Sequence, residues 1–357
     1  MKSRRWIALS LLVSGAALTA LLAVTFTPET RAYLGEVSVA ALALAVGLRA
    51  GEILCRIARA GILCSGLGYT VSVRNLAAAQ FLSLFAGSIT PGQVGGEPVR
   101  IQRLSRSGLA VGDAVTVAVT ERVLDLVVFV SLSLAAFLAV RHLWSYLAAT
   151  VLYPVAAFFV LVLVLLLALV VMVRRPLLTK RVVGGVAARV SDRCGRSQRW
   201  LRFCPGAGGG QGIGERIDRE IDIFATGSSR LARTGRRYFG GALVLTIFEW
   251  VLHFAVASAL LVALGLPPFF AESLLFQGIL QMIATIPLIP GSAGIAEIGA
   301  ATFYCRIVPT YLLGLYVVLW RLFLYYLNIP LGPLAGLLAA GEETLTEDAD
   351  PRLTENL

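Results

Sequence analysis

Long uninterrupted apolar runs dominate this 357-residue chain and decide what it can fold into. Runs of about 20 apolar residues match the length of α-helix that crosses the hydrocarbon core of a bilayer. Hydrophobic residues make up 57% of the chain and charged residues only 15%, against about a quarter charged in an ordinary soluble domain. We therefore predict an all-α polytopic membrane protein. The composition excludes a soluble globule, a disordered chain and a coiled coil.

About six of the runs are predicted to be full transmembrane helices. In chain order they cover residues 6–26, 33–54, 111–140, 146–173, 238–264 and 310–331, and the last trails toward 340. The first run follows three basic residues, as a signal peptide does, but its about 20 apolar residues exceed the usual 7–15 of a signal-peptide core. We therefore interpret it as the first span. Residues 341–357 are acidic and polar, and we expect an exposed tail after a membrane domain of residues 1–340.

Positive charge is concentrated in one loop, residues 174–237. Of the 31 Lys and Arg residues, 15 lie in this loop with only five acids, so the loop alone carries the formal charge of the whole chain, +10. Basic loops between spans stay in the cytoplasm and contact anionic lipid headgroups. We expect membrane lipid, and not nucleic acid, as its partner. Its centre, residues 205–214, lacks phosphate-loop spacing and favours a flexible Gly-rich linker.

Two shorter apolar stretches end at Pro-Gly breaks. Residues 76–89 run into Pro91-Gly92, and residues 273–289 run into Pro290-Gly291. If the first stretch crossed the membrane, the basic residues after it would face outward and the large basic loop would change sides, which the positive-inside rule disfavours. We therefore predict two re-entrant hairpins in a multi-pass plasma-membrane protein with both termini cytoplasmic. Such hairpins should line a water-filled cavity, because non-helical backbone at membrane depth needs polar surroundings.

The two halves of the chain, about residues 33–140 and 238–340, repeat each other at an offset of 199. The offset aligns the predicted hairpin-turn residues Pro91, Gly92 and Gly95 with Pro290, Gly291 and Gly294, and it aligns Arg122 with Arg321. Glu97 and Glu297 match with a shift of one position. The hairpins would enter from opposite sides, which predicts an inverted repeat with a substrate site near the midplane, as in secondary transporters. A shared way of packing two short helices is the alternative.

Ionisable side chains interrupt the predicted spans. Each costs about 3 kcal/mol at a lipid-facing helix centre, so all should point into the bundle. Glu121 and Asp125 share a helix face with Arg122 beside it, and Glu249 and His253 are also four residues apart. Arg321, Tyr325 and Asn328 follow one stripe of the last span. The candidate substrate-binding residues are Glu97, Arg100, Glu121, Arg122, Asp125, Glu249, Glu297, Arg321 and Tyr325.

Two interpretations of these charges stay open. In the first, Glu97 pairs with Arg122 and Glu297 with Arg321, and the pairs fasten each hairpin to the next span. In the second, the arginines bind a lipid phosphate through the planar guanidinium group. The carboxylates would then hold a cationic head group or a coupling proton. His253 by itself is more typical of a packing residue than of a proton relay.

Cofactor and metal chemistry find little support in the sequence. The five cysteines include no CxxC pair and the chain has only two histidines, which predicts neither a metal site nor a disulfide framework. No nucleotide-binding motif and no nucleophile-base pair is evident, so we expect no cofactor, no direct ATP coupling and no enzymatic activity.

Three motifs resemble those of the lysylphosphatidylglycerol synthase transmembrane region, also called the flippase-like domain. They are TPGQVGGE at 90–97, TERVLD at 120–125 and IPGSAGIAE at 289–297. The resemblance covers about residues 5–340, and Trp250 and Arg321 fit the later spans. It departs from the usual pattern at Ser292-Ala293, which replaces a Gly-rich step, and at Gly96, which adds a residue before Glu97.

This resemblance implies a protein that moves or modifies membrane lipids, including aminoacylated phospholipids. No soluble aminoacyl-transferase domain follows in the sequence, so we expect transfer across the bilayer and not synthesis of the lipid. The leading hypothesis is a flippase for a phosphate-bearing lipid, with aminoacylated and polyprenyl lipids as the candidate kinds. The alternatives are a membrane enzyme of lipid metabolism and a non-transporting scaffold that partners lipid-biosynthesis enzymes.

The predicted topology can be tested with single cysteines at positions 145, 209 and 343 in a cysteine-free background. An impermeant thiol reagent applied to intact cells should label position 145, because the loop after the third span is outside. Positions 209 and 343 should stay unlabelled until the cells are opened. Labelling of either in intact cells would contradict cytoplasmic placement of the basic loop or the C-terminus.

Overall fold

The computed structural model describes residues 15–90, 93–139, 160, 164, 236–284 and 294–338, with further positions between 219 and 231. All regular structure in these residues is helical, as predicted. The predicted span 146–173, the Gly-rich linker 205–214 and the tail 341–357 lie almost wholly outside the described residues. So do Pro91, Gly92, Pro290 and Gly291 of the predicted turns.

Within the described residues, three helices are long and apolar enough to cross a membrane. They are α6 (Val111–Ala139), α10 (Arg236–Ala263) and the segment Thr310–Leu338, which comprises α13 (Thr310–Leu324), η4 (Tyr326–Asn328) and a helix over 331–338. A fourth candidate is a bent pair, in which α2 (Pro28–Tyr33) and η1 (Leu34–Glu36) meet α3 (Val39–Gly66) at 75°. The first predicted span is described only as the short apolar helix Gly15–Thr25. Six spans were predicted, and three or four are present in this part of the chain.

Helix α3 departs most from the prediction, which ended a span at residue 54 with Arg56 and Arg59 beyond it. The helix begins at Val39, where the Ser38 hydroxyl caps it by accepting a hydrogen bond from the Ala41 amide at 3.3 Å. It continues through both arginines to Gly66. It can do so because both guanidinium groups find carboxylates on neighbouring helices, so neither has to mark the membrane surface.

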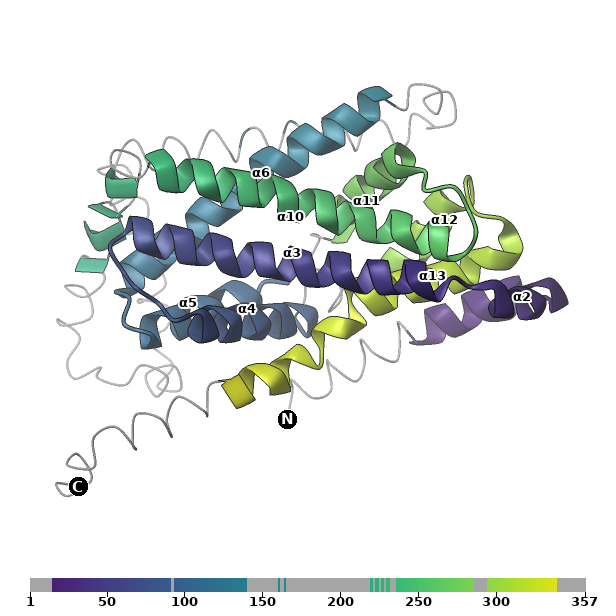
Figure 1. Ribbon diagram of the computed structural model, residues 1–357, viewed down its shortest axis with the longest axis horizontal. Helices are drawn as coiled ribbons and strands as arrows, with labels where there is room; N and C mark the ends of the chain where they lie inside the picture. Colours follow the sequence, from purple (N-terminus) through teal and green to yellow (C-terminus); the bar gives the residue numbers. More distant parts are fainter. Residues whose placement is uncertain are drawn as a thin grey trace, which may run out of the picture.

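A pair of helices is present at each predicted hairpin, while re-entry into the membrane stays a prediction. Helices α4 (Val73–Ser88) and α5 (Gly96–Arg106) pack together, as do α11 (Phe270–Ala284) and α12 (Ile295–Tyr304). The first pair lies toward one end of the long helices and the second toward the other end (Figure 1). Gly95 and Gly294 lie in the turns directly before α5 and α12, as predicted. Gly294 has φ +83°, a conformation that favours glycine.

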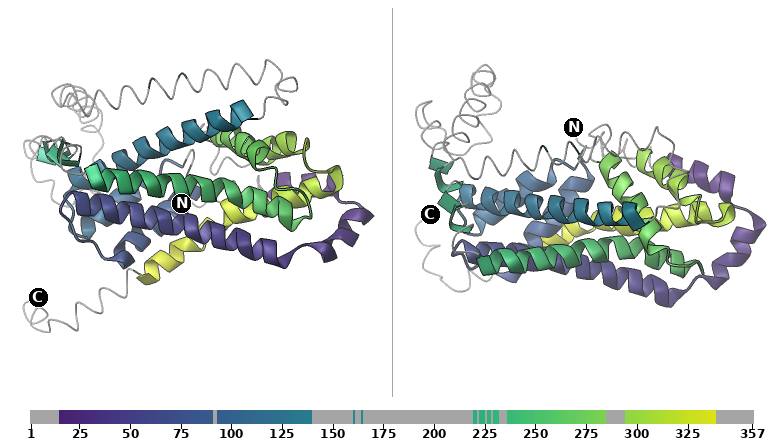
Figure 2. Two further views of the ribbon diagram at one scale, coloured as in Figure 1. Left: turned by 45° about the horizontal axis from the view of Figure 1, so that its top comes forward. Right: turned by 90° about the horizontal axis from the view of Figure 1, so that it is seen from above.

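Helices α3 and α10 lie side by side along the longest axis, on one face of the described part of the bundle (Figures 1 and 2). They run antiparallel, because Glu52 of α3 contacts His253 of α10 while Arg56 contacts Glu249. An apolar cluster containing Leu63, Leu104 and Val117 joins the C-terminal half of α3 to α5 and α6. A second cluster, which contains Tyr304 and Tyr316, joins the C-terminal half of α10 to α12 and α13. Charged residues occupy the middle of both α3 and α10, between the clusters.

The end of the second half packs against the first hairpin. The Tyr325 hydroxyl donates a hydrogen bond to the Ser88 carbonyl oxygen at 2.9 Å. Gly332 lies so close to the Phe85 ring of α4 that a Cβ there would come within 2.6 Å of it. The hairpin is therefore positioned by the last segment of the other half of the chain.

Gly332→Ala should lower the thermal stability of the purified protein, because the added methyl group must displace the Phe85 ring. Overpacking of this kind costs about 1–3 kcal/mol. Gly336→Ala is the matched control, since it lies one turn later where a Cβ would meet no atom within 4 Å. Equal melting temperatures for the two variants would show that α4 does not depend on this contact.

Candidate functional site

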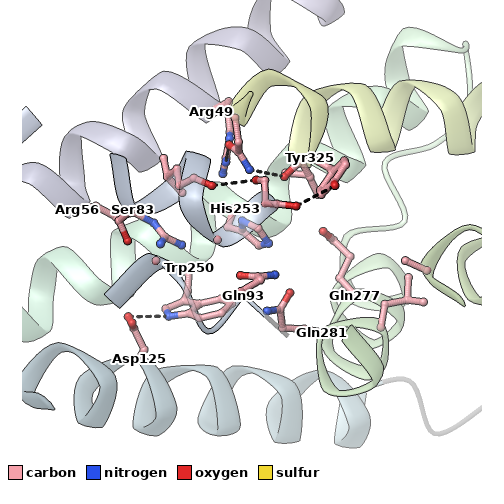
Figure 3. A pocket seen from close by; sticks show the side chains of 18 of the residues that line it. Arg49, Arg56, Ser83, Gln93, Asp125, Trp250, His253, Gln277, Gln281 and Tyr325 are labelled. Carbon is pink, nitrogen blue, oxygen red and sulfur yellow. Dashed lines mark hydrogen bonds between the residues drawn. The ribbon is translucent and has the colours of Figure 1, made fainter. Parts of the chain in front are cut away.

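A cavity of about 400 Å³ lies between the two hairpins and the long helices (Figure 3). Side chains from both halves of the chain line it, and many are charged or polar although the surrounding helices are apolar. These side chains are Arg49, Arg56, Glu97, Arg122, Asp125, His253, Gln277, Gln281, Arg321, Tyr325 and Asn328. The predicted cavity therefore exists between the predicted hairpins.

Helix α3 carries a stripe of charge that was not among the predicted site residues. Arg49, Glu52, Arg56 and Arg59 are spaced by three, four and three residues, so they share one face of the helix. Arg49 pairs with Glu52 at 2.5 Å and donates to the Asn328 side-chain oxygen at 2.7 Å. This spacing was visible in the sequence, but ending the span at residue 54 divided the stripe between a helix and a loop.

Arg59 is the centre of the buried charge network. Its guanidinium group lies 2.6 Å from Asp125 and 3.3 Å from Glu121, both on α6, and 2.7 Å from Glu249 on α10. Its side chain is almost completely buried. Glu121 also pairs with Arg100 of α5, whose side chain is buried as well. One arginine thus links three helices through buried carboxylates.

Helices α3 and α10 exchange reciprocal ion pairs. Each carries a glutamate followed four residues later by a basic residue, Glu52 with Arg56 and Glu249 with His253. Arg56 Nε lies 2.9 Å from Glu249, and His253 Nδ1 lies 3.2 Å from Glu52. Each glutamate therefore contacts the basic residue of the other helix, which is the contact pattern of two copies related by a twofold axis.

Both ion pairs anticipated from the sequence form. Arg122 Nε donates to Glu97 at 3.1 Å, and Arg321 Nε donates to Glu297 at 2.8 Å. The pairs differ in accessibility, because the Arg122 and Glu97 side chains are 56% and 25% exposed whereas those of Arg321 and Glu297 are 6% and 1% exposed. We call them the open pair and the sealed pair.

The exposure of Arg122 corrects the prediction that every intramembrane charge is turned into the bundle. Glu121 and Asp125 are buried as expected. Arg122 follows Glu121 by one residue, a rotation of about 100° around the helix, which takes it off the buried face. It reaches the cavity wall instead, and there it meets Glu97.

Glu97 and Glu297 also occupy the first turns of α5 and α12. The Glu297 carboxylate accepts a hydrogen bond from the Gly294 amide at 2.7 Å, so it caps its own helix while it pairs with Arg321. Helix N-termini favour anions. In each hairpin, a carboxylate of the protein lies where such an anion would bind.

Five of the nine predicted binding residues line the cavity: Glu97, Arg122, Asp125, Arg321 and Tyr325. The other four, Arg100, Glu121, Glu249 and Glu297, are buried. Arg100 contacts the lining residue Glu97, and the three glutamates contact Arg59 or a lining arginine. Helix α13 ends before Tyr325, so the predicted stripe of Arg321, Tyr325 and Asn328 is not one continuous helix. All three side chains still reach the cavity. Their role in binding substrate stays a prediction.

Comparisons with known proteins agree with the resemblance seen in the motifs. The family described as "Lysylphosphatidylglycerol synthase TM region" matches residues 7–332. A UPF0104 membrane protein from Archaeoglobus fulgidus is 30% identical over 280 residues, which cover 78% of this chain and 80% of the relative. A second UPF0104 membrane protein, from Methanothermobacter thermautotrophicus, is 26% identical over 225 residues, covering 61% of this chain and 60% of the relative.

Arg59→Met should strongly destabilise the protein, because the substitution leaves three buried carboxylates without their shared cation. Breaking a buried pair in this way costs about 3–5 kcal/mol. Thermal unfolding in detergent provides the measurement, and Arg106→Met at the exposed end of α5 is the control. If the two variants unfold at the same temperature, Arg59 does not hold the three helices together.

Proposed function

The chain belongs to the lysylphosphatidylglycerol synthase TM region family of multi-pass membrane proteins, and from this premise we propose that it transports a phosphate-bearing lipid across the bilayer. The observation that carries the proposal is the open pair, an arginine and a carboxylate exposed to the cavity at the break of a helix hairpin. Intramembrane ions are costly and are typical of substrate pathways. An exposed pair at such a site can exchange its internal partner for a ligand.

The two hairpins are proposed to be re-entrant segments of an inverted repeat. Three observations support this arrangement: the reciprocal pairs of α3 and α10, the equivalent pairs Glu97–Arg122 and Glu297–Arg321, and the location of the hairpins toward opposite ends of the long helices (Figure 1). In transporters with inverted repeats, discontinuous helices from both halves meet at the substrate site. The cavity has such walls, since Glu97 and Ala296 both line it from the first turns after the breaks.

The lipid head group is proposed to bind in the cavity through Arg122. A guanidinium group bonds a phosphate through two parallel N–H donors, and a phosphate at Arg122 would replace the Glu97 carboxylate there. The cavity volume of about 400 Å³ falls within the range of about 300–1,000 Å³ usual for small-molecule sites, which suits a head group whose acyl chains stay in the bilayer.

Release of Glu97 would create a second binding group within the same site. A carboxylate freed from Arg122 is suited to accept hydrogen bonds from an ammonium group. Head groups that carry both a phosphate and an amine, such as aminoacylated or ethanolamine phospholipids, would satisfy both partners at once. Lipids with this pair of charges are therefore the proposed substrate class, with polyprenyl phosphates as a related anionic class.

Transport, and not catalysis, is the proposed activity. The cavity carboxylates Glu97 and Asp125 both contact arginines, an arrangement that balances charge and does not present a free general base. In the proposed topology both termini and the basic loop 174–237 face the cytoplasm, where the loop contacts anionic lipid headgroups of the plasma membrane. Lipid-biosynthesis enzymes are the proposed protein partners.

Replacing each arginine of the two Glu–Arg pairs by lysine should separate binding from structure. Arg122→Lys keeps the charge but loses the bidentate geometry, so lipid translocation in proteoliposomes should fall about tenfold or more, as expected for loss of a charge-assisted hydrogen bond worth about 1.5–3 kcal/mol. Its melting temperature should stay near that of the wild type, because Arg122 is exposed. Arg321→Lys should lower the melting temperature instead, because the sealed pair is buried.

Fluorescent phospholipid scrambling assays measure the rate, and the melting temperature of each variant is measured in the same detergent. Wild-type translocation by Arg122→Lys, or a loss that follows unfolding alone, would return the open pair to a purely structural role. Absence of translocation by the wild-type protein with phosphatidylglycerol, phosphatidylethanolamine and aminoacylated phospholipids would contradict the proposed function itself.

A further inference from the structure

The reciprocal pairs of α3 and α10 are equivalent in position but not in chemistry. Where α3 has Arg56, which is always cationic, α10 has His253. Imidazole is the side chain that changes charge between about pH 5 and 8. His253 lines the cavity with 16% of its side chain exposed, and its ring lies near Trp250 in the middle of the site (Figure 3). Of the two equivalent basic residues, His253 can therefore change its charge, and it is accessible from the cavity.

The charges around this histidine are already balanced. Within the described residues, the ion pairs of the network join six arginines (Arg49, Arg56, Arg59, Arg100, Arg122 and Arg321) to six carboxylates (Glu52, Glu97, Glu121, Asp125, Glu249 and Glu297). With neutral imidazole and all six carboxylates ionised, the formal charges of the network cancel. A phosphate monoanion that enters the cavity adds one negative charge, and an uncompensated charge away from water is costly.

Each helix packed around α10 presents identifiable groups toward this region. Helix α3 presents Glu52 with Arg49 and Arg56 beside it, α6 presents Asp125, α13 presents Arg321, and Glu249 precedes the histidine by one turn on α10 itself. Helix α11 contributes the uncharged amides Gln277 and Gln281. Two arginines already hold Glu52, so the two groups in this set whose charge can change when a ligand enters are the imidazole of His253 and the buried carboxylate of Glu249.

We propose that His253, held against Glu52, is a proton-binding site coupled to the anionic head group, so that the protein takes up a proton from water when a phosphate monoanion binds. Nδ1 faces the Glu52 carboxylate and carries the hydrogen of the neutral ring, so the incoming proton adds at Nε2. The resulting imidazolium keeps its contact with Glu52 and balances the phosphate. This inference rests on the proposed function, and it concerns the anionic lipids of that function, because a zwitterionic head group brings its own positive charge.

Proton uptake on binding is the direct test. Purified full-length protein in weakly buffered detergent solution is titrated with dioctanoyl-phosphatidylglycerol, a soluble lipid with one negative charge, while a pH-sensitive dye reports protons. Roughly 0.5 to 1 proton should be taken up for each lipid bound at pH 7, and binding should be about tenfold tighter at pH 6 than at pH 8.5. A zwitterionic dioctanoyl-phosphatidylethanolamine should bind with little or no uptake.

Three variants locate the site. His253→Gln should bind phosphatidylglycerol more weakly at pH 6 and without proton uptake. His253→Arg installs the permanent cation of the equivalent position, so it should bind tightly at both pH values and also without uptake. His142→Gln removes the other histidine of the chain and should behave as the wild type.

The outcomes separate this inference from the function on which it rests. Binding of phosphatidylglycerol by the wild type without proton uptake, or unchanged uptake in His253→Gln, would overturn the proton site while leaving lipid binding intact. Failure of the wild type to bind any of these phospholipids would contradict the proposed function. The wild-type titration decides the matter even if a variant does not fold.

Discussion

Ionised side chains cannot rest in hydrocarbon without partners inside the protein, and this constraint organises the whole bundle. Arg59 satisfies it for three helices at once, because it contacts Glu121 and Asp125 of α6 and Glu249 of α10. The two apolar clusters pack on either side of this charged layer. Its ion pairs join α3 to both α6 and α10, so the network restricts how these three helices can be placed. The cavity lies beside this layer, so arginines that take part in the ion-pair network also line the cavity.

The two Glu–Arg pairs each connect a hairpin to the following span, but one pair is exposed and the other is buried. Glu297 caps α12 and pairs with a buried Arg321, so the second hairpin is fastened to its neighbouring span away from solvent. The first hairpin is fastened by Glu97 and Arg122, whose side chains face an accessible cavity wall. A ligand can compete for the open pair at low cost, because its groups are already partly hydrated. It could reach the sealed pair only after the helices moved apart.

The sequence predicted much of this arrangement, because the dominant signals were local. Run length identified α6 and α10, and Pro-Gly breaks identified both hairpins with their turn glycines Gly95 and Gly294. The stripe on α3 was missed since Arg56 and Arg59 were taken to mark a membrane boundary. Only the carboxylates of α6 and α10, distant in sequence, allow these arginines to lie inside a helix. The exposure of Arg122 likewise depends on where a cavity forms between elements, which helix periodicity alone does not specify.

If the halves form an inverted repeat, the difference in exposure between the open pair and the sealed pair has an explanation. In such proteins each half adopts one of two conformations, and exchanging them turns the site to face the opposite side of the membrane. The present structure would then be one of two states, with the open pair on the accessible side and the sealed pair on the closed side. In the opposite state Glu297 and Arg321 would open while Glu97 and Arg122 close. The reciprocal contacts of α3 and α10 would then lie on the axis that relates the halves, and they could persist in both states. A charge change at His253 would consequently be felt in both conformations, and this is the property that a coupling site between a proton and a transported anion requires.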